Sequence, residues 1–136
     1  MKLYRLQLNG MTDEQWDRLA ALAVSSHMTR SAYIRRILRL VVEEGYIPRT
    51  DYPRQRWRFS PAEARRMYPH KKINVVGWYT TYNLVIATRE SFLKAIDETM
   101  KRYSITTRHM FVYQCVAWAC DVGITFQMEY EHAQER

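Results

Sequence analysis

Polar and apolar residues alternate at the start of the chain. Arg5 and Gln7 are interleaved with the apolar residues Tyr4, Leu6 and Leu8. Successive side chains of a strand point to opposite faces, so this alternation predicts a strand with one apolar and one polar face. A single strand leaves its backbone edges unpaired, and we therefore expect a partner strand elsewhere in the chain.

A helical period follows the predicted strand. Trp16, Leu19 and Ala23 recur at spacings of three and four residues, which is typical of one face of a helix. Thr12 precedes them, with Gln15 three residues later, and this spacing matches a capping box. The sequence therefore predicts a first helix that begins just after Thr12.

A second amphipathic pattern begins after a break near residues 25–27. Its apolar stripe consists of Ile34, Ile37, Leu38 and Val41. Thr29 is placed to cap this helix, and Gly45 suits a position just beyond its C-terminus. Residues 1–45 are thus predicted to form one strand–helix–helix unit.

Residues 46–78 break this regularity. They hold all four prolines of the chain, and eight Lys or Arg against two Asp or Glu. Proline interrupts helices because its ring blocks a backbone hydrogen bond, so no long helix is expected here. We interpret the segment as a basic connector.

The opening pattern then recurs in YNLVIATRES, with corresponding landmarks 76 to 78 residues after those of the first unit. Thr88 and Thr106 are predicted to cap two further helices, and Gly123 to end the second of them. The predicted strand has an apolar face and an uncharged outer face, formed respectively by Tyr82, Leu84 and Ile86 and by Asn83 and Val85. Residues 79–123 are therefore predicted to be a second, divergent copy, followed by a tail at 124–136.

Two strand–helix–helix units supply each lone strand with a partner. We predict a mainly α fold with a short two-stranded antiparallel ribbon. The apolar face of the ribbon is expected to pack on four helices, and its polar face to be exposed to solvent. A two-stranded ribbon fits the major groove of DNA. Arg hydrogen-bonds guanine there, and Asn or Gln hydrogen-bonds adenine, so the polar face of the ribbon is suited to recognise bases.

The charge of the chain agrees with an anionic partner. The net charge is +7, the pI is about 9.6, and 16 of the 21 Lys and Arg residues are Arg. Residues 1–72 hold 15 cationic and 7 acidic side chains, whereas residues 73–136 hold 6 and 7. The positive charge thus lies in the first half, and nucleic acid is the usual partner of such a surface.

Residues 2–45 resemble the ribbon-helix-helix family of DNA-binding proteins. The matching features are the alternating strand, the Thr-capped first helix and the sequence MTRSAYIRR at the start of the second helix. The family comprises small repressors and plasmid or phage regulators that insert a two-stranded ribbon into the major groove. Residues 79–123 match more weakly, so the resemblance implies a duplicated ribbon-helix-helix fold.

The resemblance also implies a set of DNA contacts. The outward strand residues read bases, which in this chain are Arg5, Gln7 and Asn9, with Asn83 and Val85 in the second copy. The N-terminus of each second helix binds phosphate, through Thr29, Arg30 and Ser31 in the first copy and Thr106 and Thr107 in the second. Basic residues outside the helices, Lys2, Arg54, Arg56 and Arg58, are further candidates for phosphate contacts.

The sequence offers little for catalysis or cofactor binding. It contains no Ser-His-Asp set, no paired carboxylates and no glycine-rich phosphate loop, so we expect neither an enzyme nor a cofactor. His109, Cys115 and Cys120 are not spaced to bind zinc from one helix face, and core packing is the favoured interpretation. The two cysteines lie five apart, which disfavours a disulfide on a helix. With no apolar run long enough for a membrane span, we expect a cytoplasmic protein, nucleoid-associated or in host cytoplasm if viral.

The favoured function is a sequence-specific double-stranded DNA-binding regulator, either a repressor or an accessory factor of a mobile element. It would act as a pseudodimer within one chain or as a homodimer, and higher assembly on DNA stays open. An alternative is a protein-interaction module, antitoxin-like or a viral adaptor, that uses the apolar second half. RNA binding is a third hypothesis, which the deep, narrow major groove of duplex RNA disfavours.

Overall fold

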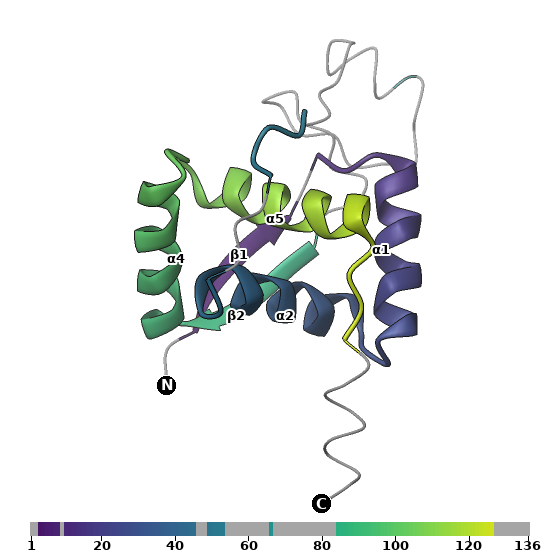
Figure 1. Ribbon diagram of the computed structural model, residues 1–136, viewed down its shortest axis with the longest axis horizontal. Helices are drawn as coiled ribbons and strands as arrows, with labels where there is room; N and C mark the ends of the chain where they lie inside the picture. Colours follow the sequence, from purple (N-terminus) through teal and green to yellow (C-terminus); the bar gives the residue numbers. More distant parts are fainter. Residues whose placement is uncertain (1–2, 9, 46–48, 54–65, 67–83, 127–136) are drawn as a thin grey trace, which may run out of the picture.

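The computed structural model describes residues 3–8, 10–45, 49–53, 66 and 84–126. Within these residues the chain has four α-helices and one two-stranded antiparallel sheet, which confirms the predicted mainly α fold with a short ribbon. The elements are β1 (Leu3–Leu8), α1 (Asp13–Ser25), α2 (Arg30–Val42), β2 (Leu84–Arg89), α4 (Glu90–Arg102) and α5 (Arg108–Val122). Each half of the described chain therefore contributes a strand followed by two helices (Figure 1).

The two strands form one ribbon with two different faces. β1 pairs with β2 over its full length, from Leu3 opposite Arg89 to Leu8 opposite Leu84. Leu6 and its partner Ile86 are buried, as is Leu8. The predicted partner for the N-terminal strand is thus confirmed, and its apolar face lies on the core.

Helices α2, α4 and α5 pack on this apolar face, and α1 packs on α2 and α5. Figure 1 shows α2 and α5 side by side across the ribbon, with α1 and α4 at opposite ends of the molecule. Each of the two central helices packs on a strand from the other half of the chain, α5 on β1 and α2 on β2. The two halves therefore interlock and share one hydrophobic core.

Local hydrogen bonds fix the starts of the first two helices as predicted. The Thr12 hydroxyl accepts from the Gln15 backbone N–H at 3.1 Å, and the Thr12 N–H donates to the Gln15 side chain at 2.9 Å, so the capping box is complete. The Thr29 hydroxyl accepts from the Ala32 N–H at 3.1 Å. Each bond satisfies a helix amide that has no partner within the helix.

The predicted cap at Thr88 is wrong. Thr88 pairs with Tyr4 in the ribbon, and β2 continues one residue further, to Arg89. Arg89 is the N-cap of α4 and makes no side-chain cap hydrogen bond, and the acidic Glu90 in the first turn complements the helix dipole instead. Cross-strand pairing holds the backbone of Thr88 extended, so β2 enters α4 directly. The first half differs, because a link that includes Gly10, at φ 81°, separates β1 from α1.

The predicted cap at Thr106 is displaced by one residue. Thr107 is the N-cap of α5, and its hydroxyl accepts from the Met110 N–H at 3.3 Å. The two helix–helix turns are otherwise alike, since His27 and Ser104 both adopt a left-handed backbone at φ 56°. The turn before α5 is one residue longer than the turn before α2, and this shifts the cap. Gly123 ends α5 in the left-handed conformation, as predicted.

The central part of helix α5 is buried on all sides. Every residue from Phe111 to Cys120 is buried, including Gln114. The Gln114 amide is satisfied because it accepts from the Tyr52 N–H at 2.9 Å and donates to the Tyr52 carbonyl at 2.8 Å. Residues 49–53 therefore cover part of the helix, and Phe126, beyond its C-terminus, is buried against Tyr33.

The two faces of β1 predict that the same Leu→Ala substitution lowers stability strongly on one face and hardly at all on the other. Leu8→Ala should destabilise the chain by about 2–5 kcal/mol, because it opens a cavity under the ribbon. Leu3→Ala removes the same atoms from the same strand, but Leu3 is 54% exposed, and we expect a change within about 0.5 kcal/mol. Urea unfolding followed by circular dichroism measures both, and equal losses would contradict the two-faced ribbon.

Candidate nucleic-acid interface

The outer face of the ribbon is exposed and carries polar residues from β1. Arg5 lies opposite Ala87 and Gln7 lies opposite Val85, and all four side chains are exposed. Directly opposite residues of an antiparallel pair have Cβ atoms about 4.5–5.5 Å apart, so these side chains form two adjacent rows on one surface. The structure thus brings together three predicted base-reading residues, Arg5, Gln7 and Val85.

Sequence reasoning missed a third polar position on this face. Arg89 is exposed and lies opposite Leu3, on the same side of the ribbon as Val85 and Ala87. The expectation of an uncharged outer face for the second strand is therefore wrong. Extending the alternation of Val85 by two further steps would have found Arg89, but the interpretation of Thr88 as a helix cap ended the strand too early.

The N-terminus of α2 lies beside one end of the ribbon. An open hollow of about 390 Å³ is lined by Thr29, Arg30 and Ser31, and also by Leu84 of the ribbon. The guanidinium of Arg30 lies 4.6 Å from the ring centroid of Trp16, and its Nε has no hydrogen-bond partner in the part of the chain that the structure describes. The stacked ring therefore holds the Arg30 charge at the helix N-terminus, next to the predicted phosphate ligands.

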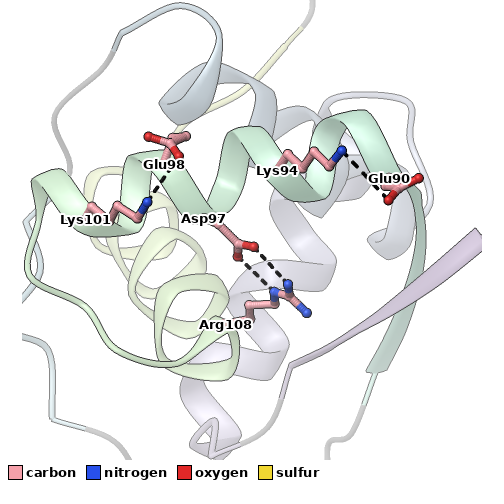
Figure 2. A network of polar contacts seen from close by, with 6 residues as sticks. All are labelled: Glu90, Lys94, Asp97, Glu98, Lys101 and Arg108. Atoms are coloured by element: carbon pink, nitrogen blue, oxygen red, sulfur yellow. Dashed lines mark hydrogen bonds and ion pairs between the residues drawn. The ribbon is translucent and has the colours of Figure 1, made fainter.

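The N-terminus of α5 has a different environment. Thr106 and Thr107 are exposed there, as predicted for phosphate ligands. Arg108, the first residue of α5, donates two hydrogen bonds of 2.9 Å each to the carboxylate of Asp97 on α4 (Figure 2). These hydrogen bonds lower the pKa of Asp97, so the carboxylate is charged near neutral pH. The positive charge at this helix end is thus neutralised within the chain.

The remaining arginines of α2 divide into two kinds. Arg36 has a side chain only 12% exposed, pairs with Glu44 at 3.0 Å and stacks on the Phe126 ring at 4.7 Å. Arg35 and Arg39 are exposed on the helix surface. Arg36 therefore stabilises packing at this end of the molecule, whereas Arg35 and Arg39 are in contact with solvent.

Six predicted contact residues lie outside the part of the chain that the structure describes. They are Lys2, Asn9, Arg54, Arg56, Arg58 and Asn83. Their roles remain predictions from the sequence. The described candidates are the ribbon face and the two helix N-termini.

The two cysteines are free thiols in the core, as the packing interpretation predicts. Burial raises the pKa of the Cys120 thiol to about 11, with a smaller opposing effect from Arg18, and burial also raises the pKa of Cys115. His109, by contrast, is exposed at the start of α5, so the core-packing interpretation is wrong for this residue. The three residues therefore do not share one environment.

The described residues contain neither a metal-binding cluster nor a helix suited to span a membrane. Among the described residues, no group of three or more His, Cys, Asp or Glu side chains is arranged to bind a metal. None of the described helices has the length and apolar character required to cross a membrane. Comparisons with protein-family models, curated protein sequences and solved structures give no match to this chain.

The raised thiol pKa values predict slow alkylation of the folded protein. With a pKa of about 11, only about one thousandth of Cys120 is thiolate at pH 8. Iodoacetamide labelling followed by mass spectrometry should be at least about 10-fold slower in the native chain than in guanidinium. The rate at Cys120 should rise as the pH approaches 11, and similar rates for native and unfolded chains would contradict the buried environment.

Proposed function

We propose that this chain is a double-stranded DNA-binding regulator, a repressor or a mobile-element accessory factor, that inserts the β1–β2 ribbon into the major groove. In this proposal the fold is a duplicated ribbon-helix-helix. The observation that carries it is the two-faced ribbon: Leu6, Leu8 and Ile86 are buried on the helices, whereas Arg5 and Gln7 are exposed on the other face. An exposed two-stranded ribbon has dimensions that the major groove admits.

The chemistry of the exposed face suits base recognition. Arg5 and Arg89 can each donate a bidentate pair of hydrogen bonds to guanine, and Gln7 can pair with adenine. Val85 and Ala87 can contact the methyl group of thymine. The two strands present different residues, so the proposed target is asymmetric.

The helix N-terminus beside the ribbon suits contacts with the DNA backbone. Thr29, Arg30 and Ser31 combine a helix N-terminus, hydroxyl groups and a cation beside one open hollow, which together favour phosphate. The net charge of +7 adds a sequence-independent attraction that weakens as salt rises. Base contacts would thus supply specificity, and the backbone contacts would supply most of the affinity.

Pairing within one chain supports a pseudodimer. β1 and β2 come from the two halves of the chain and complete one ribbon between them. The left-handed residues His27 and Ser104 lie at corresponding points of the two helix–helix turns, which supports an ancestral duplication. One chain then carries a full DNA-reading unit.

The alternative of a protein-interaction module has less support. It relied on the apolar residues of the second half being available to a partner. Within the described residues, Phe111 to Cys120 are all buried inside this chain. The apolar character of α5 is therefore accounted for by the core.

Substitutions on the ribbon face test the proposed function. Arg5→Ala, Gln7→Ala and Arg89→Ala should each weaken binding to a duplex selected from a randomised pool by about 1–3 kcal/mol. Arg39→Ala removes the same charge as Arg5→Ala from an exposed position at the last turn of α2 and serves as the matched control. Fluorescence anisotropy titrations measure the affinities.

Two outcomes would contradict this proposal. One is a failure of the selection to enrich any sequence. The other is equal binding by the ribbon variants and the Arg39 control, since a solvated strand face would give that result.

The pseudodimer predicts the composition of the smallest complex. One chain should bind one duplex site, because both strands of the ribbon belong to that chain. Light scattering or native mass spectrometry with a short selected duplex should give one chain per duplex. A minimum of two chains would indicate that ribbons form between chains.

A further inference from the structure

We propose that Asp97 holds Arg108 away from DNA. The two ends of the binding unit, which are the N-termini of α2 and α5, would then bind the phosphate backbone with unequal strength. This inference rests on the proposed DNA-binding function and adds a residue that limits its affinity. It concerns two arginines, Arg30 and Arg108, that occupy corresponding places in the two halves.

The two arginines have the same backbone position. Arg30 is the first residue of α2 and Arg108 is the first residue of α5. Each follows a threonine N-cap, Thr29 or Thr107, whose hydroxyl accepts a hydrogen bond from a helix amide. On position alone, both arginines would be equally suited to bind a phosphate at a helix N-terminus.

The surroundings of the two side chains differ. Arg30 stacks on the uncharged ring of Trp16, and within the described residues it has no ion pair. Arg108 makes a bidentate pair with Asp97, with both nitrogen–oxygen distances at 2.9 Å. The fork of a guanidinium matches a carboxylate as well as it matches a phosphate, so Asp97 occupies the groups that would otherwise bind DNA.

Asp97 is distinct among the acidic residues of α4. Glu90 pairs with Lys94 at 3.9 Å, and Glu98 pairs with Lys101 at 3.2 Å, so both acids are paired within their own helix (Figure 2). Asp97 instead reaches across to the first residue of α5 (Figure 2). It is therefore positioned to alter the charge at that helix N-terminus.

The pair lowers affinity in either of two ways. While Arg108 stays on Asp97, the helix end presents a neutral pair to the backbone. If Arg108 turned to a phosphate, the Asp97 carboxylate would remain beside the same backbone and repel it. The α2 end of the unit, where Arg30 has no ion pair with an acid among the described residues, should thus contribute more to binding than the α5 end.

Asp97→Asn tests the inference. We expect it to tighten binding to a labelled duplex of mixed sequence by about 3–10-fold at about 0.1 M salt, because it frees one cation for a phosphate. The slope of log affinity against log salt should steepen by about 0.9. Arg30→Ala should change both quantities by similar amounts in the opposite direction.

Two further variants identify the cause of the gain. Glu98→Gln removes one negative charge from the same helix without touching Arg108, and its affinity should stay within about twofold of wild type. The double variant Asp97→Asn with Arg108→Ala should return to the wild-type affinity and salt slope within the same margin. Thermal unfolding of each variant checks that the fold is retained, since an exposed pair of this kind contributes little to stability.

The outcomes separate this inference from the proposed function. If wild type binds duplex DNA and Asp97→Asn gives no gain, or no more than Glu98→Gln, the inference is wrong and the proposed function stands. If the double variant binds as weakly as Arg30→Ala, Arg108 contacts DNA in the wild-type chain and the inference is also wrong. If no variant binds duplex DNA in a salt-dependent way, the proposed function fails, and the inference fails with it.

Discussion

The pairing of β1 with β2 is the interaction on which the rest of this structure depends. Either strand alone would expose two unpaired backbone edges and would have no second strand to complete an apolar surface. Together the strands bury Leu6, Leu8 and Ile86 in a single layer that the helices cover. The pairing joins the two halves of the chain, so it also fixes where the N-termini of α2 and α5 lie relative to the ribbon.

Much of the fold could be predicted because its determinants are local. The alternation around Arg5 defines β1, and the spacing of Thr12 and Gln15 defines the start of α1. These rules act within a few residues and do not require knowledge of the tertiary structure. The same is true of Gly123, whose left-handed backbone ends α5. The outward positions of Arg5 and Gln7 could be predicted for the same reason, because they follow from the local alternation of β1.

The remaining features could not be predicted because they depend on contacts between distant residues. Thr88 is equally suited to cap a helix or to sit in a strand, and only its pairing with Tyr4 decides between these roles. That decision adds a residue to β2 and brings Arg89 onto the outer face. Asp97 and Arg108 are eleven residues apart, and their pairing depends on the turn between α4 and α5.

In the proposed function, a binding unit built from one chain can differ between its two halves, which a symmetric dimer cannot. In a homodimer, any change at one helix N-terminus appears at the other, so both ends must bind the backbone equally. Here the corresponding positions differ, with Arg30 stacked on Trp16 and Arg108 held by Asp97. The outer rows of the ribbon differ as well, and each half can therefore acquire its own contribution to affinity and to sequence preference. If the chain binds DNA as proposed, joining two strand–helix–helix units in one chain would allow recognition of an asymmetric site without a second protein.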